Sequence, residues 1–219
     1  MTWMIVAFME LASVLSPEAV LQSVRDKHRL AEDVSYTFTQ TWIDELRGAR
    51  PSESGTILVK KDGRFRWAYQ QPERKDFIFD GARAWLYEPS KSQATEFEGF
   101  ATSAASQALQ VLWGRGKLDT LFNLDWCSTD CPQGDGLHFL ELRPKQALAT
   151  LERMVLKVDK RDNRIAGAVS YDPMGNQTVY ELSQPKRGTS HKDTWFEFVV
   201  PDGVNVIRVN VNSQKSGPN

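Results

Sequence analysis

Hydrophobic and polar residues alternate with a period of two along much of this chain, which is the pattern of β-strands that bury one face. The first such run begins at Val34 and ends near Gly48, with Tyr36, Phe38 and Trp42 on one face. Further strands are predicted over residues 93–98, 137–143, 154–159, 165–171, 178–182 and 195–199. No helices alternate with these strands, so the sequence predicts an antiparallel meander that is closed or nearly closed.

Two Asp-Gly pairs, Asp62-Gly63 and Asp80-Gly81, lie between β-branched and aromatic runs and predict two consecutive β-hairpins over residues 55–89. With Asp62 and Gly63 at the centre of a two-residue turn, Leu58 faces Trp67. One face of the sheet then carries Leu58, Lys60, Phe65, Trp67 and Tyr69. So large an aromatic surface needs an apolar cover. Either a helix of the same chain covers it permanently, or the cover is incomplete or movable and the face lines a cavity.

Two segments are predicted to be helical. Ser16 and Pro17 mark a helix start, and the apolar spacing that follows predicts an amphipathic helix over residues 17–31. Residues 101–122 are rich in helix formers and predict two short helices, divided at Gly114 and Gly116. This second segment is our candidate lid over the aromatic face.

The ends of the chain are expected to differ from its single central domain, residues 16–211. Residues 1–15 are mostly apolar but too short to span a bilayer. Glu10 interrupts this run and no basic residue precedes it, so it is either a degenerate or truncated export signal or the apolar start of the first helix. Residues 212–219 form a polar tail.

Charge and motif content weigh against several function classes. The 27 Lys and Arg residues balance 28 Asp and Glu residues, which gives no reason to expect a nucleic-acid partner. His28, His138 and His191 lie in distant segments, and we find no motif of nucleophilic, zinc-protease or nucleotide chemistry. We therefore expect no enzyme activity, no cofactor and no metal. A hydrolase whose Ser, His and Asp meet only in the fold is the remaining catalytic alternative.

Cys127 and Cys131 stand four residues apart. No second Cys or His pair has metal spacing, so a zinc site is not expected. Two interpretations remain for the pair: a short disulfide in an oxidising compartment, or two free thiols.

A series of short motifs, in order along most of the chain, resembles the LolA family of periplasmic carriers of outer-membrane lipoproteins. They are Phe38-Thr39-Gln40, Ser54-Gly55-Thr56, Val59-Lys60, Arg64-Phe65-Arg66-Trp67, Pro72, Asp80-Gly81, Trp85, Tyr87, Pro89, Gln93-Ala94-Thr95, Phe196-Glu197-Phe198 and Pro201-Asp202-Gly203-Val204. The resemblance implies a mainly β fold with short helices, an incomplete antiparallel β-barrel whose helical lid closes an apolar cavity that holds acyl chains.

The same resemblance implies a function and partners. The family carries acylated lipoproteins through the periplasm, from an inner-membrane ATP-driven transporter to an outer-membrane receptor, and the chain would act as a monomer. A carrier or sensor of another lipid on the same fold, such as a glycolipid or a lipid ester, is the alternative.

We expect the cavity to be lined by hairpin and lid residues: Leu58, Phe65, Trp67, Tyr69, Trp85, Tyr87, Leu109, Leu112 and Trp113. The family has Lys-Arg-Pro at the tip of its first hairpin, where the arginine holds the lid, and these positions are Lys60, Lys61 and Asp62 here. Lysine lacks the planar donor fork of arginine, so Lys61 is either an altered latch or a solvated charge. Phe65 is expected at the cavity rim, where it would meet the loading transporter.

Overall fold

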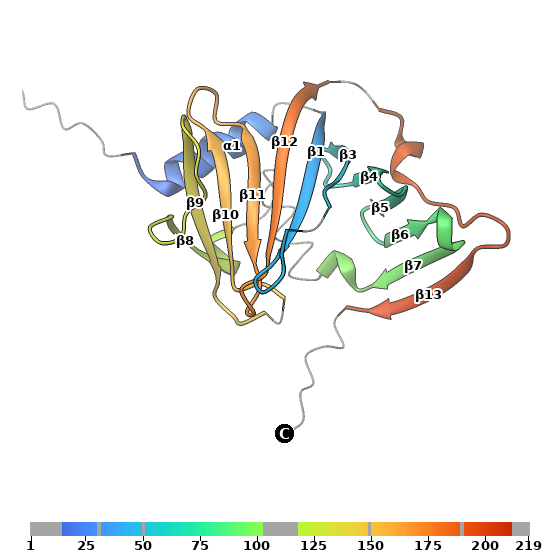
Figure 1. Ribbon diagram of the computed structural model, residues 1–219. Helices are drawn as coiled ribbons and strands as arrows, with labels where there is room; N and C mark the ends of the chain where they lie inside the picture. The colour runs from blue at the N-terminus through green and yellow to red at the C-terminus, as the bar shows by residue number, and fades with distance from the viewer. Residues whose placement is uncertain are drawn as a thin grey trace, which may run out of the picture.

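The structure is a computed structural model that describes residues 15–29, 32–49, 51–102, 118–148, 150–188 and 191–211. One large sheet takes up most of this part of the chain (Figure 1). Its strands are β1 (Asp33–Asp44), β2 (Gly48–Ala49), β3 (Glu53–Lys60), β4 (Phe65–Gln71), β5 (Lys75–Phe79), β6 (Ala84–Glu88), β7 (Gln93–Glu98), β8 (Phe122–Trp126), β9 (Leu137–Pro144), β10 (Arg153–Asp159), β11 (Ile165–Tyr171), β12 (Gln177–Arg187) and β13 (Asn205–Asn210). The helical elements are α1 (Pro17–Arg29), η1 (Pro89–Lys91), η2 (Phe100–Thr102), α3 (Leu118–Leu121) and η3 (Asp193–Phe196).

The sheet is strongly curved and stays open. Its order is β13-β7-β6-β5-β4-β3-β1-β12-β11-β10-β9-β8, with β2 paired to β1, and within the described residues the end strands β13 and β8 do not pair. Figure 1 shows β9–β12 upright, with β6, β7 and β13 running across their direction. The predicted incomplete antiparallel barrel is confirmed, with one exception: β13 runs parallel to β7. The predicted lid segment is residues 101–122; residues 103–117 lie outside the described residues, Leu118–Leu121 is helical as predicted, and Phe122 begins β8 instead.

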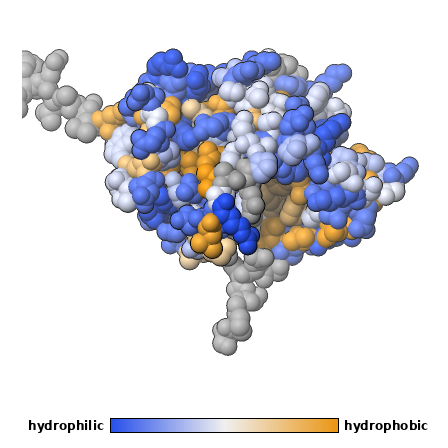
Figure 2. Space-filling model, in the orientation of Figure 1, coloured by the Kyte–Doolittle hydropathy of each residue, from blue (hydrophilic) through white to orange (hydrophobic). Residues whose placement is uncertain are grey.

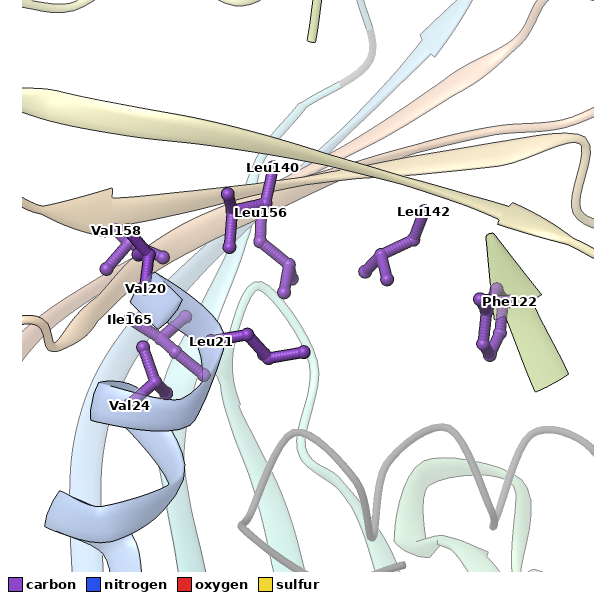
Figure 3. Close-up of a cluster of buried hydrophobic side chains, with 9 residues drawn as sticks. All are labelled: Val20, Leu21, Val24, Phe122, Leu140, Leu142, Leu156, Val158 and Ile165. Carbon is purple, nitrogen blue, oxygen red and sulfur yellow. The ribbon is translucent and has the colours of Figure 1, made fainter. Parts of the chain in front are cut away.

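Helix α1 covers one half of the sheet on the face that we call the inner face. Ser16 caps the helix, since its Oγ accepts a hydrogen bond from the backbone N–H of Ala19 at 3.2 Å. Figure 3 shows the side chains of Val20, Leu21 and Val24 lying among those of the sheet. The cluster that they form is completed by Phe122, Leu140, Leu142, Leu156, Val158 and Ile165. Of the described helices, none is long and apolar enough to cross a membrane.

A second buried cluster lies on the inner face of the other half of the sheet. Leu182 of β12 packs against both clusters, which places them on the same face. The buried members of the second cluster are Phe38, Ile57, Val59, Phe65, Phe79, Ala84 and Phe100. The inner face is therefore apolar across most of the described sheet.

The opposite face, which we call the outer face, is also covered in the β3–β6 half. The cover is η3 and the residues that follow it: Phe196 is fully buried, and the ring of Phe198 lies 5.3 Å from those of Trp85 and Tyr87. The strand predicted at 195–199 is therefore wrong. Residues 195–199 have a high β-propensity, which indicates side chains that fit a half-buried surface. Here Phe196 and Phe198 pack on the face of the sheet, and their backbone does not pair with a neighbouring strand.

The first hairpin has a three-residue turn, and the predicted two-residue turn is wrong. Lys60 and Arg64 close the turn, with the Lys60 N–H donating to the Arg64 carbonyl at 2.8 Å, and Gly63 takes a φ of +94°. Such a turn uses glycine at its left-handed position. The pairing shifts by one residue, so Val59 instead of Lys60 lies opposite Phe65. A shift of one residue moves side chains to the other face of a strand.

Cys127 and Cys131 form a disulfide with an S–S distance of 2.13 Å. Their loop lies against the outer face of the β9–β12 half. Arg153 holds it there by donating to the carbonyl of Thr129 at 3.2 Å, and the Tyr171 hydroxyl donates to the carbonyl of Asp130 at 3.3 Å.

The α1 cluster generates a stability prediction. Leu156 is fully buried, so Leu156→Ala removes apolar contacts and leaves a cavity, and we expect a loss of about 2–5 kcal/mol in the free energy of unfolding. Leu46 is 94% exposed, and Leu46→Ala should change that free energy by less than about 0.5 kcal/mol. Chemical denaturation followed by circular dichroism measures both values. Similar losses in the two variants would contradict the assigned core.

The disulfide generates a second prediction. In freshly isolated protein, unfolded without reductant, neither Cys127 nor Cys131 should react with a thiol reagent, and both should react once a reductant is added. Mass spectrometry of the labelled chain counts the modified cysteines. Quantitative labelling without reductant would show that both are free thiols.

Candidate functional site

The candidate site is a group of aromatic side chains on the inner face of β1 and β3–β7, which we call the aromatic cluster. Its members are Phe38, Phe65, Trp67, Tyr69, Phe77, Phe79, Phe97 and Phe100. Their rings are in direct contact: Phe77 lies 5.5 Å from Phe65 and 5.8 Å from Phe97, and Phe38 lies 4.9 Å from Tyr69. Rings at these separations gain edge and stacking contacts beyond simple burial.

Strand alternation and register together bring these rings to one face. Phe65, Trp67 and Tyr69 occupy every second position of β4, so all three point to the same side. On β5, Phe79 lies opposite Phe65 and Phe77 lies opposite Trp67. Gly55 of β3 makes room beside them, because a Cβ atom there would lie only 1.9 Å from the carbonyl oxygen of Ala68.

The cluster is unevenly buried. Phe65, Phe79 and Phe100 are almost fully buried, whereas Trp67, Tyr69, Phe77 and Phe97 are half-buried. Figure 2 shows hydrophobic atoms gathered in a hollow between the upright strands and the lobe formed by β6 and β7. Half-buried aromatic rings are the lining that apolar ligand sites use.

One end of the cluster is polar. The Tyr69 hydroxyl donates a hydrogen bond to Gln40 Oε1 at 2.7 Å, and Tyr180 of β12 lies beside Gln40 in the sheet. Burial raises the pKa of Tyr180 to about 12, and burial also raises the pKa of Tyr69. Both hydroxyls therefore stay protonated and uncharged at neutral pH.

The predicted lining residues lie on both faces of the sheet. Phe65, Trp67 and Tyr69 lie on the inner face as expected, but Leu58 lies opposite Arg66 on the outer face. Trp85 and Tyr87 are on the outer face too, under Phe198. The assignment of these three to the cavity is wrong because the C-terminal segment makes the outer face apolar as well. Leu109, Leu112 and Trp113 lie outside the described residues.

The predicted lining omitted five members of the cluster: Phe38, Phe77, Phe79, Phe97 and Phe100. Phe77 and Phe79 alternate along β5, and Phe97 is paired with Ala84 of β6 across the sheet. This alternation was a usable signal for Phe77. Phe100 belongs to η2, directly after β7, and no periodic pattern marked its position.

The position of Phe65 also differs from the expectation. Phe65 is only 3% exposed and touches Phe77, Phe79 and Phe100, so the expected place at a rim is wrong. Lys61 forms an exposed ion pair with Glu32 at 3.1 Å.

The other charges at the hairpin tip hold the outer cover. Arg64 pairs with Asp193 of η3 at 3.0 Å, and Lys60 pairs with the same carboxylate. The hydrogen bond from Lys60 lowers the pKa of Asp193, with a further contribution from the charge of Arg64. Both basic side chains also lie over the ring of Phe196, at 5.7 Å and 5.8 Å.

The described part of the chain offers no group of side chains suited to binding a metal ion. There, no three His, Cys, Asp or Glu residues lie close enough to hold a metal ion. His191 donates its backbone N–H to the buried carboxylate of Asp33 at 2.7 Å, and its ring lies beside the same group. The arrangement can bind an apolar ligand by surface burial.

Comparison with known proteins bears on what that ligand is. The family model described as outer membrane lipoprotein carrier protein LolA matches residues 29–199. An outer-membrane lipoprotein carrier protein of Bordetella pertussis is 29% identical over 173 residues, which are 79% of each chain. One of the same name from Methylococcus capsulatus is 24% identical over 192 residues, 88% of each chain.

A solved structure is similar in fold. It is an uncharacterized conserved protein from Thermus thermophilus, with a TM-score of 0.55 and 14% identity, covering 88% of this chain and 98% of the other. At that identity the likeness concerns the fold alone. The family match spans most of the chain and includes every strand from β1 to β12. This chain belongs to the LolA family of outer-membrane lipoprotein carrier proteins.

Proposed function

We propose that this protein is a periplasmic carrier that shields the acyl chains of lipoproteins and moves them from the inner to the outer membrane. The observation that carries the proposal is the aromatic cluster, whose half-buried rings Trp67, Tyr69, Phe77 and Phe97 line the inner face of an open sheet. Family membership supports the same role. A carrier needs no chemical step, and the proposal assigns the protein no enzyme activity.

Burial of apolar surface is sufficient for tight binding. Moving an acyl chain from water into an apolar site gains about 0.8 kcal/mol per methylene group, so a chain of sixteen carbons gains on the order of 12 kcal/mol. No strong hydrogen bond is needed for that affinity, and the site must also release its cargo. An open sheet suits release, because separating a movable cover from the inner face exposes the ligand without breaking strand pairing.

The cover and the partners complete the proposal. The segment 103–117, with Leu109, Leu112 and Trp113, is proposed to act as the lid over the aromatic cluster. An inner-membrane ATP-driven transporter would load the carrier, and an outer-membrane receptor would accept the lipoprotein. The carrier is proposed to act as a monomer.

The cargo is tested by purifying the protein from periplasm and identifying bound molecules by mass spectrometry. We expect acylated protein with the native chain and at least about 10-fold less with Phe77→Ala, because the lost ring removes apolar contact worth roughly 1.5–3 kcal/mol. Val199 is 84% exposed and lies outside the cluster, so Val199→Ala serves as the matched control and should carry the native amount. Free lipid instead of acylated protein would favour a carrier of another lipid, and an empty protein would contradict the proposal.

Phe65→Glu tests whether Phe65 is part of the core or contacts the transporter. Because Phe65 is 3% exposed, the new carboxylate would be buried among aromatic rings, and we expect a loss of several kcal/mol in stability. Val199→Glu introduces the same charge at an exposed site and should leave the melting temperature almost unchanged. The measurement is thermal unfolding beside cargo loading. A native melting temperature with loading abolished would instead indicate that Phe65 lies at the cavity rim and contacts the transporter.

A further inference from the structure

The inner face changes from apolar to polar in one direction, across several neighbouring strands. Along β4 the lining passes from Phe65 through Trp67 to Tyr69. The same change occurs on β5, from Phe77 to Lys75, and on β1, from Phe38 to Gln40. The site therefore has an aromatic part near the first hairpin turn and a polar end away from it, as the paired positions of these strands show.

The polar end is made of side chains from five strands. In the sheet Gln40 lies directly between Glu53 of β3 and Tyr180 of β12, and it accepts the hydrogen bond of Tyr69. Lys75 lies 4.3 Å from the centre of the Tyr69 ring and pairs with Glu53 at 2.6 Å.

One hydrogen-bond donor at this end is unsatisfied. The Nε1–H group of Trp67 is buried and has no acceptor among the described residues. The indole ring lies 5.4 Å from the ring of Tyr180, which places it next to the polar end. Buried donors are nearly always paired, so an orphan donor beside an apolar site calls for an acceptor from elsewhere. A bound ligand is such a source.

The charges restrict the chemistry of that acceptor. Glu53 and Lys75 neutralise each other, and the buried tyrosine hydroxyls are uncharged at neutral pH. None of these groups offers an unpaired positive charge to a carboxylate or phosphate. Such a ligand group would also be repelled by the carboxylate of Glu53. A neutral carbonyl oxygen accepts a hydrogen bond without these penalties.

We propose that the polar end binds the ester carbonyl that joins an acyl chain to glycerol, with Trp67 Nε1–H as the donor. This inference rests on the proposed function, since it assigns an orientation to the lipid in the same site. The alkyl chain extends over the half-buried rings of Phe77 and Phe97, and the glycerol ester lies beside Trp67 and Tyr180. Trp67 thus positions the lipid and selects ester-linked over ether-linked chains.

The test compares two probes of matched chain length, dioctanoylglycerol and its diether analogue dioctylglycerol, which lacks both carbonyls. Dissociation constants come from displacement of a fluorescent fatty-chain probe. We expect native protein to bind the ester about 5- to 10-fold more tightly than the ether, the effect of one buried hydrogen bond. In Trp67→Phe, which keeps an aromatic ring but has no N–H group, the ratio should fall to about one. Trp85→Phe, on the outer face, is the matched control and should keep the native ratio.

The outcomes separate this inference from the proposed function. Binding of both probes with the same ester-to-ether ratio in native protein and Trp67→Phe overturns the inference and leaves the carrier role intact. Binding of neither probe to native protein contradicts the carrier role and the inference together.

A second measurement needs no variant. In protein labelled with nitrogen-15 at tryptophan, the Nε1–H resonance of Trp67 should move downfield when dioctanoylglycerol binds, and much less with dioctylglycerol. The six other indole resonances provide internal controls. Equal displacement by the two probes would overturn the proposal even if Trp67→Phe failed to fold.

Discussion

The fold depends on keeping water from both faces of β3–β7. The strands β3, β5 and β6 carry apolar side chains on both sides, so neither face can be left bare. The two covers are built differently. Phe196 and Phe198 of the C-terminal segment close the outer face, and Asp193 ties this segment to Lys60 and Arg64. On the inner face, Phe100 covers the deepest rings and leaves Trp67, Tyr69, Phe77 and Phe97 half-buried.

The outer and inner faces of these strands therefore have different roles. The outer cover combines aromatic contacts with ion pairs. The inner face retains partly accessible apolar area, and a lipid can supply the contacts that the protein leaves unmade. The outer face of these strands therefore contributes buried contacts only, whereas the inner face provides both core rings such as Phe65 and half-buried rings that a ligand can contact.

The positions of the strands could be predicted from the sequence far better than the face of the sheet on which each side chain lies. Period-two alternation located β1, β7, β9, β10 and β11 closely, and in β9 and β11 one side is visibly more buried than the other. It failed where both sides are buried: in β3, Ile57, Leu58 and Val59 are all buried, so alternation could not tell which side Leu58 takes. The length of the turn sets the register and therefore the face on which Leu58 lies. An Asp-Gly pair is compatible with both a two-residue and a three-residue turn, so the sequence did not determine that length. β8 and β13 were missed, since each is short and β13 pairs in parallel with a distant strand.

The parallel pairing of β13 with β7 has a consequence for how the chain is made. Arg208 meets Glu96 across 112 positions, and η3 reaches the outer face from almost as far along the chain. The β4–β7 hairpins pair locally and can form early, but their cover and their edge partner come from the final part of the chain. Until those residues arrive, the hairpins present an apolar face and an open edge, the features that promote aggregation. A chain of this design gains from being held unfolded, or shielded by another protein, until residues 193–210 are available.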